Sequence, residues 1–120
     1  MIHIIREPAT PQQIREMLEA FETYIKLAVD IKREVLAGGS ILHSDCEALL
    51  LEDESKQEDI WGADWIPSSQ TKEPISGGEI RFEALINIRP RQNNFSLEIQ
   101  DSKIRFKIET IVRKLLGGAK

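Results

Sequence analysis

The stretch Gly38–Gly62, GGSILHSDCEALLLEDESKQEDIWG, organises the sequence around it. It begins with two adjacent glycines and contains Cys46, the single cysteine, and His43, one of two histidines. It also holds the densest run of carboxylates in the chain. If the protein has a reactive site, we expect most of it to lie in this stretch.

A short helix is predicted inside this stretch. Ser44 and Glu47 match the capping box S-x-x-E, in which each side chain bonds a backbone N–H at the helix start. Asp45 adds negative charge at the positive end of the helix dipole. The leucine run that follows supplies the apolar body of a helix over residues 45–52.

Two strands and a longer helix are predicted before this stretch. Residues 2–6 are apolar and β-branched, which is typical of a strand, and residues 11–22 have helical spacing after the cap residue Thr10. Residues 24–32 alternate between apolar and polar, which predicts a strand with one buried face. Residues 33–42 form either a second strand, with its glycines at a bulge or close backbone approach, or a loop.

Two further strands are predicted after the stretch. Residues 60–66 form a strand with both tryptophans on one face, and residues 80–89 form a second, antiparallel strand that Pro90 ends. The segment between them, 67–78, is polar and rich in Pro, Ser and Gly, so it is predicted to be a surface loop. The connection 91–100 shows no regular pattern.

The last helix begins after Asp101 and ends at the glycine pair that starts with Gly117. The order β-α-β-(β)-α-β-β-α, without a repeat or a domain boundary, predicts one α+β domain over residues 1–120. We expect a single, mostly antiparallel sheet of four or five strands with three helices packed on one face. The apolar stripe of the last helix consists of Ile104, Ile108, Ile111, Val112 and Leu115.

The composition is that of a globular domain. The chain has 120 residues, of which 41% are hydrophobic and 30% charged, enough to bury a core without disulfides. A single cysteine excludes an internal disulfide and fits a reducing cytoplasm. The start MIHIIREP lacks the features of a signal peptide, and no apolar run reaches membrane-spanning length, so we expect no membrane association.

The net charge of −4 argues against general nucleic-acid binding, which requires excess Lys and Arg. The charge is uneven, because residues 45–59 hold seven carboxylates and one lysine, whereas residues 103–120 hold six cations and one carboxylate. These segments can meet within the fold or between copies, so we predict a homo-oligomer, of which a homodimer is the simplest form. Phe106, opposite the apolar stripe of the last helix, is a candidate partner surface.

Four residues are candidates for catalysis: His43, Asp45, Glu47 and Asp59. Imidazole and carboxylates serve in acid–base chemistry and as metal ligands. A capped helix start is the preferred interpretation, because it already uses Asp45 and Glu47, and we assign no metal. Cys46 with His43 as its base is a further hypothesis, although a lone cysteine is more often a small buried side chain.

A second set of side chains are candidates for ligand binding. Arg89 near a strand end suits a carboxylate or phosphate, and equally an internal salt bridge with the acidic segment 45–59, which we prefer. Trp61 is expected in the core or at an oligomer interface. The candidate ligand-binding residues are Gln57, Trp61, Asn87, Arg89, Gln92 and Asn94.

The runs LHSDCEALLLEDESKQEDIWG at 42–62 and LINIRPRQNN at 85–94 resemble a small bacterial family of uncharacterised proteins, domain of unknown function 5674. The family pattern is a GG-x-LH-x-D-x-E run, a GS-x-Q-x-x-LWG run and an (M/I)NIRP-x-Q-x-N run. The chain departs from it at Glu54, where the pattern has glycine, and at Phe95, where it has a basic residue, which argues against anion binding by that loop. The resemblance implies no activity and no cofactor. The matching residues are Gly38, Gly39, Leu42, His43, Asp45, Glu47, Ser55, Gln57, Trp61, Gly62, Asn87, Ile88, Arg89, Pro90, Gln92 and Asn94.

No GxGxxG, GxxxxGK[ST], HExxH or GxSxG pattern occurs, which disfavours the common nucleotide-binding, metalloprotease and hydrolase classes. The sequence identifies no cofactor and no reaction. We expect a small cytoplasmic binding or regulatory module that self-associates. The alternative is a small enzyme or metal-binding protein whose polar site is formed by His43, Asp45, Glu47, Asp59 and Arg89.

Overall fold

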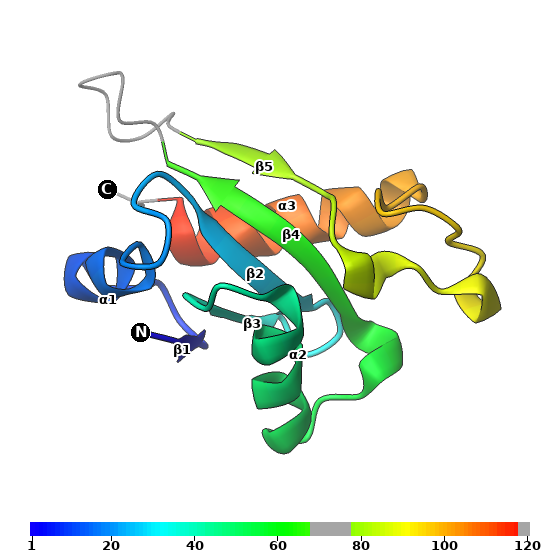
Figure 1. The fold of residues 1–120 in the computed structure, drawn as a ribbon, viewed down its shortest axis with the longest axis horizontal. Coiled ribbons are helices and arrows are strands. Elements are labelled where there is room, and N and C mark those ends of the chain that lie inside the picture. Colours follow the sequence, from blue (N-terminus) through cyan, green and yellow to red (C-terminus); the bar gives the residue numbers. More distant parts are fainter. Residues whose placement is uncertain (68–77, 118–120) are drawn as a thin grey trace.

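The computed structural model describes residues 1–67 and 78–117, which form one five-stranded antiparallel sheet and three α-helices (Figure 1). The strand order is β1-β3-β2-β4-β5, and each neighbouring pair is antiparallel. The predicted α+β class is therefore confirmed. The strands are β1 (His3–Ile5), β2 (Ile25–Asp30), β3 (Val35–Gly38), β4 (Ile60–Ile66) and β5 (Glu79–Arg81), and the helices are α1 (Pro11–Met17), α2 (His43–Glu52) and α3 (Ser102–Leu116).

The long strands β2 and β4 form the centre of the sheet. They pair over their whole common length, with Val29 opposite Trp61 and Ile25 opposite Trp65. Both tryptophans lie on one face, as predicted, and both are buried. The predicted antiparallel pairing of the next strand, β5, with β4 is confirmed, and it places Asp64 opposite a β5 residue.

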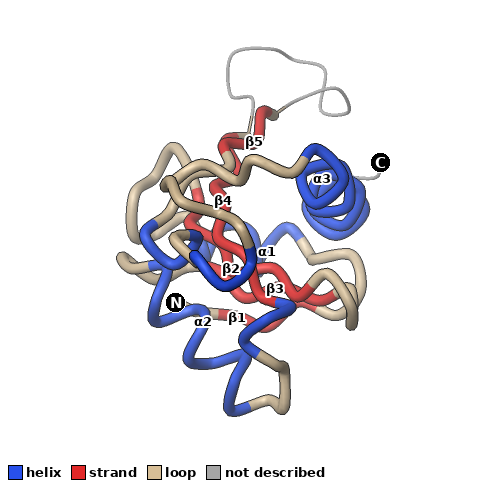
Figure 2. Tube along the Cα trace, turned by 90° about the vertical axis from the view of Figure 1, so that its right-hand side faces the viewer, coloured by secondary structure: helices blue, strands red, loops and turns tan. Residues whose placement is uncertain are grey.

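The sheet separates two hydrophobic cores. On one face, the tryptophans and Leu27 of β2 pack against α1 and α3. On the other face, Ala28 and Ile60 pack against Cys46 and Leu50 of α2. The helices therefore divide between the two faces (Figure 2), in contrast to the expectation that all three pack on one face.

The alternation of β2 did not indicate the second core, because its apparently polar face is buried as well. Ala28 is small enough to lie under a helix, and it is fully buried. Asp30 is also fully buried, but its carboxylate accepts bonds from the backbone N–H groups of Lys32 and Arg33 and from the Ser55 hydroxyl, at 2.6–2.9 Å. A buried carboxylate with these donors is tolerated, because its lost hydration is replaced.

Residues 33–42 contain a strand, β3, and the glycine pair that ends it marks a close backbone approach, one of the two predicted alternatives. A Cβ on Gly38 would lie 2.8 Å from the Leu27 side chain. A Cβ on Gly39 would collide with the Met1 carbonyl, and the φ of Gly39 is +111°. Only glycine combines that backbone conformation with that contact.

The helix predicted over residues 11–22 is shorter in the structure and ends at Met17. Thr10 caps its start as predicted. Beyond the helix the chain turns through Glu22, which has a left-handed φ of 67°, and then enters β2 at Ile25. The position of β2 in the sheet imposes this turn, and tertiary context of this kind overrides helical spacing.

The strand predicted over residues 80–89 is also shorter, because β5 ends at Arg81 and a 3-10 helix follows at Leu85–Asn87. Asn87 takes the place of a continued strand at the outer side of β4. The Gly62 N–H donates to Asn87 Oδ1 at 2.8 Å, and Asn87 Nδ2 donates to the Gly62 carbonyl at 3.0 Å. A side-chain amide has the same donor and acceptor pair as a peptide group, so it can replace one.

Helix α2 begins earlier than the capping box predicts. Its N-cap is Leu42, which makes no side-chain capping bond. Ser44 therefore lies inside the first turn, and the predicted capping box of Ser44 and Glu47 does not form. The carboxylates of Asp45 and Glu47 instead contact Ser40 and Arg89, respectively.

Helix α3 agrees with its prediction. Asp101 caps it by accepting a bond from the Lys103 backbone N–H at 2.8 Å, and its apolar stripe enters the core beside the tryptophans. Phe106 is 73% exposed on the outer side of the helix. None of the described helices combines the length and the apolar character needed to cross a membrane. Most of the predicted surface loop 67–78 lies outside the described residues.

Candidate functional site

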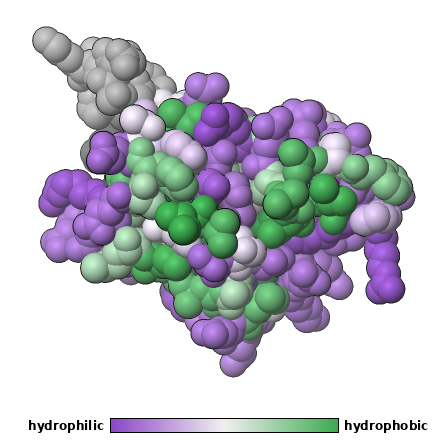
Figure 3. All heavy atoms as spheres, viewed as in Figure 1, coloured by the Kyte–Doolittle hydropathy of each residue, from purple (hydrophilic) through white to green (hydrophobic). Residues whose placement is uncertain are grey.

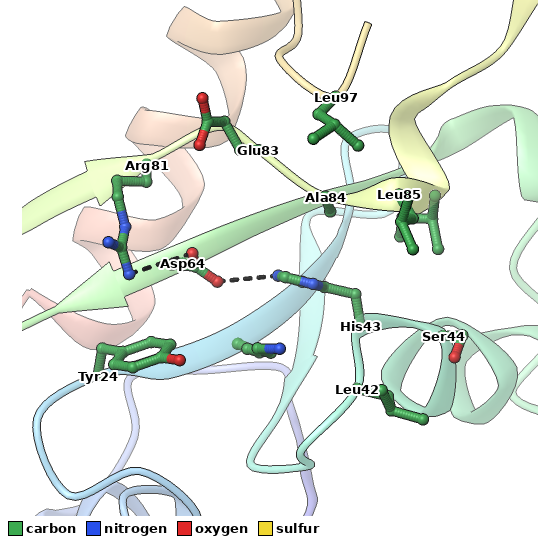
Figure 4. A pocket seen from close by; sticks show the side chains of 12 residues that line it. Tyr24, Leu42, His43, Ser44, Asp64, Arg81, Glu83, Ala84, Leu85 and Leu97 are labelled. Atoms are coloured by element: carbon green, nitrogen blue, oxygen red, sulfur yellow. Dashed lines mark hydrogen bonds and ion pairs between the residues drawn. The ribbon is translucent and has the colours of Figure 1, made fainter.

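Three polar side chains from different elements join beside the start of α2 (Figure 4). Asp64 of β4 lies between His43, the first residue of α2, and Arg81, the last residue of β5. His43 Nε2 lies 2.8 Å from Asp64 Oδ1, and Arg81 Nη2 lies 3.4 Å from Asp64 Oδ2. His43 Nε2 also lies 3.1 Å from the Ala63 carbonyl oxygen. Because both neighbours of Nε2 are acceptors, Nε2 carries a proton and donates it.

These side chains form the floor of a pocket of about 470 Å³, termed the His43 pocket. Leu42, Leu85 and Leu97 border it and are 50%, 77% and 45% exposed. Figure 3 shows hydrophobic groups gathered at the centre of this face, among hydrophilic surroundings. The pocket is lined by Tyr24, Lys26, Leu42, His43, Ser44, Asp64, Arg81, Glu83, Ala84, Leu85, Ile86 and Leu97.

Aromatic rings support the two cations of the His43 pocket. The Arg81 guanidinium carbon lies 5.1 Å from the centre of the Tyr24 ring, and Lys26 Nζ lies 5.1 Å from the centre of the Phe21 ring. The two rings stack on each other at 4.6 Å. In Figure 4 the Glu83 carboxylate points away from Asp64. The pocket therefore holds two supported cations, Lys26 and Arg81, beside the carboxylates of Asp64 and Glu83.

A second polar cluster lies one helical turn further along α2. Glu47 Oε2 lies 3.3 Å from Arg89 Nη2, and the two side chains are only 12% and 10% exposed. Arg89 also donates to the carbonyls of Ile86 and Gln57, at 3.0 and 2.7 Å. Burial lowers the pKa of Arg89, and the Glu47 carboxylate opposes this effect, so the guanidinium stays charged. The preferred interpretation of Arg89, an internal salt bridge with the acidic segment, is confirmed.

Gln92 and Trp61 complete this cluster. Gln92 Nε2 donates to the Glu58 carbonyl at 3.0 Å, and its Oε1 lies 3.3 Å from Arg89 Nη1. The Trp61 ring centre lies 4.8 Å from the guanidinium carbon of Arg89. A pocket of about 510 Å³ borders the cluster and shares Ile86 with the His43 pocket. The two pockets therefore lie next to each other along α2.

Asn87 and Asn94 are used inside the chain. Asn87 bonds β4, as described above, and also donates to the Leu97 carbonyl at 3.1 Å. Asn94 Nδ2 lies 2.8 Å from the Asn87 carbonyl and 3.0 Å from those of Ser96 and Glu98, and Asn94 Oδ1 accepts from the backbone N–H of Gln100. Because both amides are buried and bonded at both ends, their observed role is to hold the 82–100 segment together.

The remaining candidates lie apart from these clusters. Asp45 Oδ2 accepts a bond from the Ser40 hydroxyl at 2.6 Å. Asp59 ends a 3-10 helix, and its backbone carbonyl accepts from the Ile31 N–H. Cys46 is buried, and burial raises the pKa of its thiol to about 11. A thiol that stays protonated at neutral pH is a poor nucleophile, which argues against Cys46 catalysis.

The structure thus brings Glu47, Gln57, Trp61, Arg89 and Gln92 together and turns His43 toward Asp64 instead. Their part in ligand binding or catalysis stays a prediction. Sequence reasoning missed Asp64 and Arg81, which sit in alternating strand segments and face each other directly in the β4–β5 register. Predicting this pair would have required the register of β4 and β5, which the sequence pattern does not specify.

Within residues 1–67 and 78–117, no three His, Cys, Asp or Glu side chains are close enough to hold a metal ion together. What the two pockets offer is a set of oriented charged and polar groups beside exposed apolar side chains. That combination suits recognition of a molecule with a polar or charged group and an apolar part.

Comparison with curated proteins and with solved structures yields no match for this chain. A family model does match, over residues 3–115, and so includes the site-forming residues from α2, β4 and β5 as well as the Arg89 cluster. The chain therefore belongs to the family described as protein of unknown function (DUF5674).

Proposed function

We propose that this protein is a small bacterial, cytoplasmic binding module whose ligand site is the His43 pocket. The observation that carries the proposal is the contact of Asp64 with both His43 and Arg81 on the floor of an open pocket. Such oriented polar groups beneath a rim of exposed leucines are the usual make-up of a small-molecule site, where apolar walls supply affinity and polar groups supply orientation.

The ligand class follows from the donors in the pocket. Arg81 and Lys26 are cations, and the two acceptor atoms of Asp64 are already occupied by His43 and Arg81. A carboxylate would gain charge-assisted bonds from the cations, while an attached apolar group would contact Leu85 and its neighbours. We therefore propose a small organic acid with an apolar portion as the ligand.

We propose binding and not catalysis, because the candidate catalytic residues are engaged in contacts within the protein. Asp45 bonds Ser40, and Glu47 bonds Arg89. His43 directs Nε2 at Asp64, an arrangement that fixes the ring and suits it to orient a ligand. A regulatory role would follow if ligand binding changed how the protein meets a partner.

The experiment is a nuclear magnetic resonance titration of the labelled protein with matched fragments. Hexanoate and benzoate are the probes, and hexanamide and benzamide are their uncharged counterparts. We expect the acids to shift the backbone amides around Tyr24, His43, Asp64 and Arg81, with dissociation constants on the order of 1 mM, as usual for fragments. The amides should shift them at least about five-fold more weakly, because they lack the charge that the cations recognise.

Two variants complete the test. Arg81→Gln should reduce the preference for acids over amides, because only Lys26 remains as a cation in the pocket, whereas Arg15→Gln, at an exposed position on α1, should leave it unchanged. Shifts confined to other parts of the protein, or equal shifts by acid and amide, would contradict the proposal.

Self-association is the second part of the proposal. Among the described residues, no ion pair joins the acidic segment 45–59 to the basic residues 103–117. The two segments thus do not neutralise each other within the described fold. Glu47 and Asp53 pair with arginines elsewhere, and Arg113 pairs with Glu109, so the remaining charges are left for contact between copies. We propose a homo-oligomer, with no role for nucleic acid. Light scattering that shows a monomer at high concentration, in both low and high salt, would remove this part of the proposal.

A further inference from the structure

A groove on the outer side of α3 combines an exposed aromatic ring with lysines. Phe106 is 73% exposed, and a cavity of about 290 Å³ lies beside it. Lys103, Lys107 and Lys114 line this cavity, and Ile111 also lines it. None of these three lysines forms an ion pair with another described residue. We term this surface the Phe106 groove.

The end of α2 has the complementary character. Leu51 is 41% exposed, and Glu52 and Glu54 next to it are exposed carboxylates without an ion pair to any described residue. We term residues 51–54 the acidic tip. An apolar side chain beside exposed carboxylates complements an aromatic ring between lysines in both charge and hydrophobicity.

Hydrogen bonds tie the acidic tip to the rest of the fold. Asp53, in its middle, accepts bonds from Arg6 at 2.7 Å and from Arg33 at 2.8 Å. The turn after α2 is closed by the Ser55 N–H, which donates to the Leu50 carbonyl at 2.9 Å. A pre-ordered surface loses little conformational entropy on docking, so even a small contact can be productive.

The groove and the tip lie on different sides of the molecule. Helix α3 covers the face of the sheet with the tryptophans, and α2 covers the other face (Figure 2). Glu34, which lines the groove, is the one carboxylate among its lining residues. An acidic segment can therefore approach the lysines with little like-charge repulsion.

We propose that the acidic tip of one copy docks into the Phe106 groove of a second copy. The proposal rests on the self-association proposed above and names the surfaces that carry it. Leu51 contacts Phe106, while Glu52 and Glu54 approach Lys103, Lys107 and Lys114. Because few residues take part, the contact is weak, with a dissociation constant on the order of 0.1 mM, and it weakens as salt screens the charges.

The test compares two charge-reversal variants, Lys107→Glu in the groove and Glu52→Lys in the tip, by sedimentation velocity at several concentrations in low salt. Each should associate at least about five-fold more weakly than the unchanged protein, because an attraction becomes a repulsion. An equal mixture of the two should recover association, because the intact tip of the first variant fits the intact groove of the second. Arg15→Glu and Glu7→Lys, at exposed positions elsewhere, are the matched controls and should behave like the unchanged protein.

The outcomes separate the two levels of the proposal. If the unchanged protein is monomeric in low and high salt, self-association itself fails. If it associates and both variants associate equally well, or if the mixture does not recover, self-association stands and the tip-to-groove interface is wrong. A different result is a protein that stays monomeric and binds a single-stranded oligonucleotide, with that binding lost in Lys107→Glu. This result would assign the lysines to nucleic-acid binding and overturn the proposal. Circular dichroism melts of each variant exclude misfolding as the cause.

Discussion

The side chain of Asn87 makes the backbone hydrogen bonds to β4 that a neighbouring strand would otherwise make. Its amide meets both the N–H and the carbonyl of Gly62, so the outer side of β4 is bonded where β5 has already ended. The same amide donates to the Leu97 carbonyl, which ties in the following segment. The sequence pattern marked this residue as a ligand candidate, whereas its contacts are structural.

Replacing Asn87 should therefore cost stability. Asn87→Ala leaves the buried N–H and carbonyl of Gly62 without partners, and we expect the free energy of unfolding to fall by about 2–4 kcal/mol. Urea denaturation followed by circular dichroism measures the change. Asn93→Gly is the control, because Asn93 is exposed with a left-handed φ of 59° that glycine also adopts. An equal loss in both variants would contradict the structural role of Asn87.

Asp53 makes stability depend on acid pH. Bonds to Arg6 and Arg33 lower the pKa of its carboxyl from the usual 3.8 to about 2. Because the folded-state pKa is depressed, the stabilisation is complete above about pH 4 and is lost as the pH falls toward 2. The melting temperature of the unchanged protein should thus exceed that of Asp53→Asn at neutral pH, and the difference should shrink as the pH falls through this window. A difference that is as large at pH 2 as at neutral pH would show that charge is not its origin.

At the residue scale, the sequence marked His43 as a candidate site residue, which stays a prediction, but it did not indicate the partner of His43. The pairing of His43 with Asp64 spans twenty-one positions and three elements. Asp64 looked like an ordinary outward residue of a strand, because the alternation of β4 says nothing about the helix that covers that face. The salt bridge of Arg89 was easier to predict, because its partner lies in a segment that the sequence shows to be rich in carboxylates.

At the scale of elements, β4 packs against the 3-10 helix Leu85–Asn87 at Gly62. There is no room at that position for a side chain larger than a hydrogen atom. A Cβ on Gly62 would lie 2.5 Å from the Cβ of Ala84 and 3.0 Å from Cγ1 of Ile86. Gly62 therefore sets how closely this segment approaches the strand, and through Ile86 it also sets the wall shared by the two pockets.

Gly62→Ala should destabilise the protein by about 1–3 kcal/mol through overpacking. The double variant Gly62→Ala with Ala84→Gly removes the nearest contact and should recover about half of the loss, less the cost of an added glycine. Thermal melts of the two singles and the double measure this coupling. Strictly additive losses would mean that the clash is relieved by some other movement.

The elements most readily predicted were those whose signal is local. Thr10 and Asp101 cap their helices as expected, and β4 runs over residues 60–66 as its alternation indicated. The errors fell where distant contacts override local preference. The capping box at Ser44 did not form, because α2 begins at His43, whose ring contacts Asp64 of β4.

For the molecule as a whole, the important feature is one sheet shared by two cores. Leu50 is fully buried between α2 and the sheet, on the face opposite the tryptophans. Strands β2 and β4 contribute side chains to both cores, so each core depends on the same backbone. The α+β class followed from the order of elements, but the second core did not, because it depends on small residues such as Ala28.

Leu50→Ala tests whether the two cores unfold together. We expect a loss of about 2–5 kcal/mol, as for other buried leucines. Tryptophan fluorescence, which reports the opposite core, should show the same midpoint shift as far-ultraviolet circular dichroism. The neighbouring Leu51→Ala, 41% exposed, is the matched control and should cost less than about 1 kcal/mol. A fluorescence midpoint that does not move would mean that the cores are independent.

The short outer strands have a consequence for solubility. Strands β1 and β5 pair over only three residues each, while the buried β2 and β4 between them are longer and apolar. An exposed, regular strand is a template on which other chains can add and aggregate. Here the outer strands are too short to act as one, and the Asn87 amide occupies backbone groups of β4 that would otherwise be open for strand addition. Among the described residues, the sheet therefore offers other chains little open edge on which to add a strand.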